Sequence, residues 1–116
     1  MSDVLKENAN GFGAINASLV IPDGKTYRLT EVRVKLQTAA STSENLLITL
    51  DAAAGENYDT TYLTHDPGTS GKTSIVWAPD HELDLVGGDA IDVTWTNTDD
   101  CQWGLEYTAV RVRQPC

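Results

Sequence analysis

Apolar and polar residues alternate with a period of two along most of this chain, which is the spacing of strands that bury one face. The pattern is clearest at residues 31–36 (EVRVKL), 46–51 (LLITLD) and 91–96 (IDVTWT). The best helical candidate, 39–45, is rich in Ser and Thr and has no apolar stripe, so we interpret it as a loop. The pattern therefore predicts an all-β protein.

Turn-forming residues divide these alternating runs. The strongest turn signal is 21–25 (IPDGK), because proline presets φ and glycine accepts a positive φ. Further turns are expected at 54–57, 66–71 and 86–89, with a polar corner at 97–100. Eight strands are predicted between the turns, at residues 12–21, 27–37, 45–52, 58–65, 73–77, 83–85, 90–97 and 102–113. This number and spacing point to a sandwich or a barrel. We expect an antiparallel, jelly-roll-like β-sandwich over residues 11–116, preceded by an N-terminal arm over residues 1–10.

The last predicted strand contains a change of phase. Trp103, Leu105 and Tyr107 point to one face, whereas Val110 falls on the other. An extra residue in a strand pair produces such a change, so a β-bulge is predicted near 108–109.

The length and the net charge of the chain limit its number of domains and its classes of partner. The chain has 116 residues, which fits one domain, and a net charge of −9, which argues against a nucleic-acid partner. Between Glu44 and Glu106, Lys72 is the only cation among thirteen acids. This asymmetry indicates either a solvated acidic loop face or a basic strip that docks on an acidic neighbour. The cations of the strip are Arg28, Arg33, Lys35, Arg111 and Arg113.

The first eight residues are acidic and polar, where a secretory leader has a basic segment followed by an apolar one. No apolar stretch approaches the ~20 residues of a membrane span. We therefore expect synthesis in the cytoplasm of the cell that makes the protein, and no membrane partner. In that compartment Cys101 and Cys116 are expected to be free thiols, with a link between chains through Cys116 as the alternative.

Catalytic and metal-binding motifs are not recognisable in this sequence. His65 and His81 both lie beside predicted turns and carboxylates, and no serine lies in a Gly-x-Ser-x-Gly elbow. The glycine-rich turns lack the Lys-Ser/Thr ending of a phosphate-binding loop. Acids at 80–84 and 99–100 offer oxygen ligands for calcium, but neither group matches the spaced Asp/Asn-Gly-Glu pattern of a helix-loop-helix calcium site. We predict no enzymatic activity, no cofactor and no metal.

The aromatic residues offer two interpretations. The phases of Trp77, Trp95 and Trp103 place at least two of them in the core, whereas an exposed Trp103 beside the polar corner would form a sugar-stacking platform. Tyr58 and Tyr62 share one face of a predicted strand, which indicates either a subunit contact or a half-buried sheet face.

One segment carries a resemblance to a known group of proteins. Residues 77–93 (WAPDHELDLVGGDAIDV) combine a Leu-x-Leu, a Gly-Gly-Asp and an Ile-x-Val, and Trp95-x-Asn97 and 103–105 (WGL) follow. This segment resembles the second half of small jelly-roll proteins on tailed-phage particles, including capsid decoration (cement) proteins and fibre-associated domains. Glycines in such a turn allow a tight reversal, and the Asp side chain accepts from turn amides.

The resemblance implies a non-enzymatic virion protein on the capsid surface, bound to the major capsid protein and self-associated as a homotrimer. It also implies a terminal arm that grips the shell by adding a strand to an exposed sheet edge. The alternative is a carbohydrate- or receptor-binding module of a phage tail or fibre. The residues expected at capsid or subunit contacts are Val4, Leu5, Phe12, Tyr58, Tyr62, Arg111 and Arg113.

Overall fold

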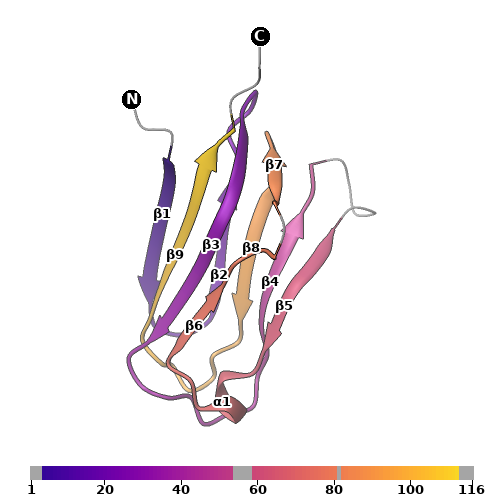
Figure 1. Cartoon of the computed structure of the whole chain (residues 1–116). Helices are drawn as coiled ribbons and strands as arrows, with labels where there is room; N and C mark the ends of the chain where they lie inside the picture. Colours follow the sequence, from indigo (N-terminus) through magenta and orange to yellow (C-terminus); the bar gives the residue numbers. More distant parts are fainter. Residues whose placement is uncertain (1–3, 54–58, 81, 113–116) are drawn as a thin grey trace.

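Two antiparallel sheets pack face to face (Figure 1). The buried apolar side chains of both sheets form one core. The computed structural model describes residues 4–53, 59–80 and 82–112. The first sheet has the order β1 (Val4–Gly11), β9 (Trp103–Arg111), β3 (Thr26–Leu36) and β6 (Ser74–Trp77), with β7 (Asp84–Val86) also paired to β3. The second sheet has the order β2 (Ile15–Val20), β8 (Ala90–Trp95), β4 (Leu46–Asp51) and β5 (Thr60–His65). A single helical turn, α1 (Pro67–Ser70), follows β5.

The connectivity is that of a jelly roll. Strands β6 and β7 pair with successive parts of β3 in the same direction, so they are two halves of one interrupted strand. With those halves counted together, each sheet has four strands, and the described chain changes sheet at every connection except the one between β4 and β5. Two four-stranded sheets with this alternation define the jelly-roll class, so the predicted sandwich is confirmed.

The core lies between the sheets and consists of alternate residues from both. Burying one large apolar side chain at such a position contributes about 1.5–3 kcal/mol of favourable transfer free energy. The least accessible members are Ile15, Leu19, Ile21, Leu29, Val32, Val34, Leu46, Ile48, Leu85, Ile91, Val93 and Ala109.

The predicted bulge is present, but in the partner strand. Leu29 of β3 pairs with Ala109 and Glu31 pairs with Thr108, which leaves Thr30 as the extra residue. The Thr30 hydroxyl donates to the Thr108 carbonyl at 2.8 Å and so closes the irregular step. Because of the extra residue, the buried phase of β3 changes between Leu29 and Val32.

Strand β9 keeps one phase throughout, which corrects the sequence interpretation. Its small Ala109 continues the buried face, and Val110 is 40% exposed on the outer face. The prediction was wrong in choosing the strand because it ranked the larger apolar Val110 above Ala109 as the buried residue.

The described part of the expected N-terminal arm is also a strand. From Val4 to Gly11, β1 pairs antiparallel with β9 along its whole length and forms the edge of the first sheet. The sequence pattern missed this strand because Lys6, Glu7 and Asn8 interrupt any apolar alternation. None of the residues of β1 is fully buried, whereas β2, an edge strand of the second sheet, buries Ile15 and Leu19 and was predicted. The described chain therefore has nine strands where eight were predicted.

A buried polar side chain joins two of the connections between the sheets. Asn97 is 1% exposed and adopts a φ of 48°, the left-handed conformation that Asn tolerates better than most residues. Its Nδ2 donates to the carbonyls of Gly13 at 2.7 Å and Cys101 at 2.9 Å, and its Oδ1 accepts from the Cys101 amide at 3.0 Å. The Trp103 indole nitrogen donates to the same Gly13 carbonyl at 3.0 Å. Asn97 thereby ties the β1–β2 turn to the β8–β9 connection.

We expect Asn97→Ala to lower the free energy of unfolding by at least about 2 kcal/mol, because it leaves buried backbone groups of Cys101 without partners. Urea denaturation measures the loss. The matched control is Asp100→Ala, since Asp100 also has a positive φ, 55°, but is exposed. Equal losses in the two variants would show that backbone strain accounts for the effect and that the hydrogen bonds contribute nothing.

Candidate functional site

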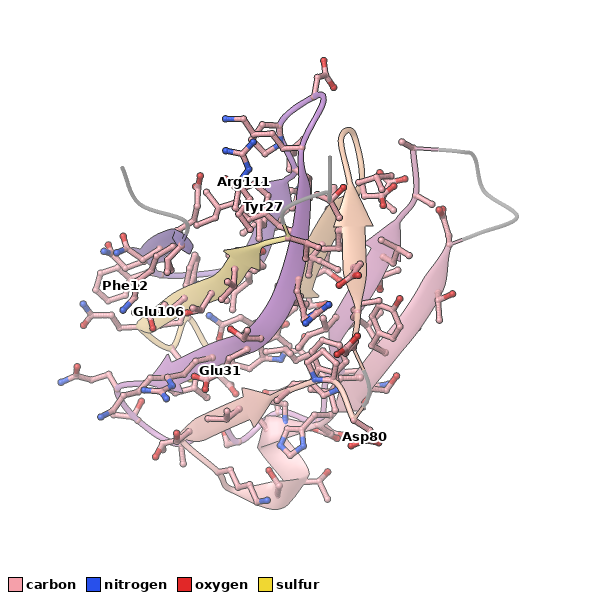
Figure 2. The ribbon with its side chains drawn as sticks, turned by 45° about the horizontal axis from the view of Figure 1, so that its top comes forward. Phe12, Tyr27, Glu31, Asp80, Glu106 and Arg111 are labelled. Atoms are coloured by element: carbon pink, nitrogen blue, oxygen red, sulfur yellow. The ribbon has the colours of Figure 1, made fainter. Side chains whose placement is uncertain are left out.

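The predicted contact residues do not form one surface. Val4 and Leu5 begin β1, where Val4 is exposed and Leu5 packs partly against the core. Arg111 ends β9 opposite Tyr27, near the same end of the first sheet. Phe12 lies at the far end of β1 in the turn to β2 and is 70% exposed. Figure 2 shows Phe12 well separated from Arg111 and Tyr27.

Tyr62 lies on the second sheet, at the opposite edge of the sandwich. It is the extra residue of a second bulge, because Ile48 pairs with Leu63 and Thr49 pairs with Thr61. The bulge turns Tyr62 against the core, where its ring stacks on Trp77 of the first sheet with centroids 5.2 Å apart. Burial, followed by the charge of Asp89, raises the pKa of the Tyr62 hydroxyl.

The half-buried interpretation therefore describes Tyr62 better than an open subunit contact. Its predicted companion Tyr58, and the predicted contact residue Arg113, lie outside the described residues.

Three cations of the predicted basic strip lie among acids on the outer face of the first sheet, namely Arg28, Arg33 and Lys35, whereas Arg111 has the inward phase of Ala109. The Arg28 Nε donates to an Asp84 carboxylate oxygen at 2.9 Å, and this bond raises the pKa of the guanidinium. Solvent-exposed pairs of this kind contribute little to stability, but they reduce the net positive charge of the strip. The ion pairs join Arg28 to Asp84 and Glu82, Arg33 to Glu31, and Lys6 to Glu106. Lys35, also on this face, forms no ion pair with any described residue.

A hollow lined by both apolar and polar groups lies on the same outer face, where β9 carries a glycine. Gly104 pairs with Asn10 of β1 on one side and Lys35 of β3 on the other. No atom of a non-adjacent residue lies within 4 Å of the place that a Cβ on Gly104 would take. Two adjoining hollows of about 420 and 280 Å³ share these three residues and extend toward Gln102 and Glu106. We call this feature the Gly104 trough.

Carboxylates fasten the loops at the end of the sandwich that carries α1. The Asp99 carboxylate accepts from the backbone amides of Ser41 and Thr42 at 2.9 and 2.8 Å and from the Thr42 hydroxyl at 2.7 Å. These bonds lower the pKa of Asp99. The Glu44 carboxylate in turn accepts from the Thr98 amide at 2.9 Å, so the 37–45 and 96–102 loops are held together from both sides.

Asp66 is the N-cap of α1. Its carboxylate accepts from the amides of Gly68 and Thr69, at 3.0 and 3.2 Å, and from the hydroxyls of Ser43 and Thr69. The hydroxyl bonds, with Ser43 first, lower the pKa of Asp66 to about 2. Acids that the sequence offered as calcium ligands or as a solvated face thus serve partly as loop fasteners.

Two of the three tryptophans lie in the core, as predicted. Trp95 is buried in β8, and Trp103 is 8% exposed with Gly11 packed over its ring. Trp77 is half-buried under Tyr62. The alternative role of Trp103 as a sugar platform is therefore wrong, because the ring faces inward and its nitrogen is bonded to Gly13.

The described histidine and cysteine side chains do not form a catalytic or metal-binding cluster. The His65 Nε2 and Ser70 Oγ lie 2.9 Å apart, and within the described residues no carboxylate orients the other ring nitrogen. Cys101 is a buried free thiol, and Cys116 and His81 fall outside the described ranges. No group of three metal-ligating side chains occurs in residues 4–53, 59–80 and 82–112. In that same part of the chain, no helix has the length and apolar character needed to span a bilayer.

No protein-family model matches this chain, and no curated protein matches its sequence.

We expect stability to fall as the pH drops from about 4 toward 2. The pKa of Asp66 is lowered from 3.8 to about 2, so its stabilising contribution is present above pH 3.8 and is lost as the carboxylate takes up a proton. Urea midpoints across this range measure the effect. Asp66→Asn keeps the cap of α1 but should flatten the profile. Asp100→Asn is the control and should leave the profile unchanged, because the Asp100 carboxylate forms no hydrogen bond to a described residue. Asp99, whose pKa is also lowered, keeps part of the slope in every variant, so a profile in Asp66→Asn as steep as that of the native protein would contradict the assignment.

Proposed function

We propose that this chain is a non-enzymatic virion structural protein that binds the head of a tailed phage as a capsid decoration protein. The resemblance of residues 77–105 supports this role, and the jelly-roll connectivity agrees with what the resemblance implies. The observation that carries the proposal is the edge of the first sheet, where the exposed Phe12 follows directly after β1.

An edge strand is a template for another chain. Strand β1 pairs with β9 on one side, and within the described residues no strand of the first sheet lies beyond it. A capsid segment added there would gain main-chain hydrogen bonds. Lys6 and Glu7 place charges of opposite sign on the two faces of β1, and such charges oppose indiscriminate edge pairing. The edge is therefore suited to a matched partner rather than to aggregation.

Phe12 supplies a candidate anchor beside this edge. Aromatic side chains dominate binding energy when a partner buries them, and Phe12 has most of its ring available. In this proposal the capsid contact comprises the β1 edge and Phe12, with Val4 and Leu5 at its far end. Tyr62, which lies across the sandwich, is not part of it. Association as a homotrimer around a capsid axis belongs to the same proposal.

A carbohydrate-binding module of a tail or fibre is the second candidate function. The observation that favours it is the Gly104 trough, not the buried Trp103.

Quantitative mass spectrometry of purified particles, measured against the major capsid protein, tests the location. A decoration protein is expected in hundreds of copies per particle, because it follows the capsid lattice. A handful of copies would favour a tail or fibre location, and absence from clean particles would refute the virion role.

Phe12→Ala tests the anchor on particles that lack the protein. We expect at least a tenfold loss of particle affinity with an unchanged thermal midpoint, since the ring is 70% exposed and contributes little to the fold. The matched control is Val20→Ala, another large exposed side chain, at 58%, on β2 of the other sheet. Equal affinity of the Phe12 variant and the native protein would remove Phe12 from the contact.

A further inference from the structure

Gly104 has no structural reason to be a glycine. It is the second residue of β9 and is paired on both sides, where glycine weakens a strand relative to residues with side chains. Glycines in strands normally allow a positive φ, a bulge or a close approach within the fold. Gly104 has none of these: its φ is not positive, its pairing with both neighbouring strands is regular, and the space above it is open.

The remaining reason for such a glycine is the close approach of a ligand to the strand. The Gly104 trough has the form that this requires. Its floor is the bare backbone of β9, one wall is Asn8 and Asn10 of β1, and the other wall is Arg33 and Lys35 of β3. A hollow of about 420 Å³ is within the range of small-molecule sites.

The polar groups of the trough indicate a polyhydroxylated ligand. Amides from Asn8, Asn10 and Gln102 each offer donors and an acceptor, and Glu106 adds further acceptors. A ligand with many hydroxyl groups, each both donor and acceptor, matches such a mixed set. A purely anionic or purely apolar ligand would leave half of these groups without partners.

The charge of the trough indicates which kind of sugar. Lys35 lines both hollows and forms no ion pair within the described residues, while Arg33 and Glu106 are paired to neighbours. In a chain of net charge −9, this leaves a local positive site on an otherwise acidic protein. We propose that the Gly104 trough binds an acidic saccharide, with one sugar ring against the backbone of Gly104 and its carboxylate facing Lys35.

This site deepens the second candidate function and rests on it, but it does not depend on the capsid role. The two are distinguishable, because counting copies on particles tests the location and a titration with free saccharides tests the trough.

The experiment is a titration of the isotope-labelled full chain, followed by NMR of the backbone amides. The acidic probes are tri-galacturonic acid and 3′-sialyllactose, and the neutral probes are galactotriose and lactose. We expect an acidic probe to shift the amides of Gly104, Asn10 and Lys35. Gly104→Val, which fills the floor, and Lys35→Ala, which removes the cation, should each weaken binding at least tenfold.

Two controls make the result specific. Gly104→Val should melt no lower than the native protein, because its side chain enters open space on a strand. Lys72→Ala removes the same charge from an exposed position after α1 and should leave binding unchanged. The proposal is overturned if neither acidic probe binds, if neutral probes bind equally well, or if shifts occur elsewhere on the chain. It is also overturned if Lys72→Ala weakens binding as much as Lys35→Ala, or if Gly104→Val and Lys35→Ala both bind normally.

Discussion

The fold depends on holding two sheets together where the chain crosses between them, and Asn97 is the side chain that does this. It satisfies buried backbone groups from two connections that are more than eighty residues apart in sequence. Apolar packing between the sheets is non-directional and tolerates sliding. A buried amide whose donors and acceptor all have partners does not tolerate sliding, because any shift leaves one of these groups without a partner. Asn97 therefore fixes the position of the β1–β2 turn, and through it the edge strand and Phe12.

Two bulges set which side chains face the core and which face solvent. The extra Thr30 in β3 changes the buried phase of the central strand of the first sheet, so Arg33 and Lys35 point outward beside Gly104. The extra Tyr62 in β5 brings an aromatic ring onto Trp77 and closes the opposite edge of the sandwich. The trough and the closed edge are thus consequences of single-residue irregularities in otherwise regular pairing.

The acids of this chain have two roles that the net charge alone does not separate. Asp66, Asp99 and Glu44 accept hydrogen bonds from loop amides and hydroxyls and hold one end of the sandwich. Glu31, Glu106 and Asp84 lie between cations on the first sheet and reduce its positive charge. Among the described residues, Lys35 is the cation of β3 that forms no ion pair, and its position beside a strand glycine makes it a candidate for ligand binding.

The sequence by itself determined the class of fold and most of the strands, because burial of one sheet face imposes a period of two and turns require Gly, Pro and Asn. It also placed at least two of the three tryptophans in the core and predicted a bulge near Thr108, although in the wrong strand. Only the tertiary structure decided that the bulge lies in β3 and that residues 4–11 form a strand, because β1 buries no residue fully and is held by its pairing with β9. The same holds for the candidate sites. The open space above Gly104 and the lack of an ion pair at Lys35 among the described residues depend on which residues surround them. Those residues come from three strands, which lie side by side only in the folded chain.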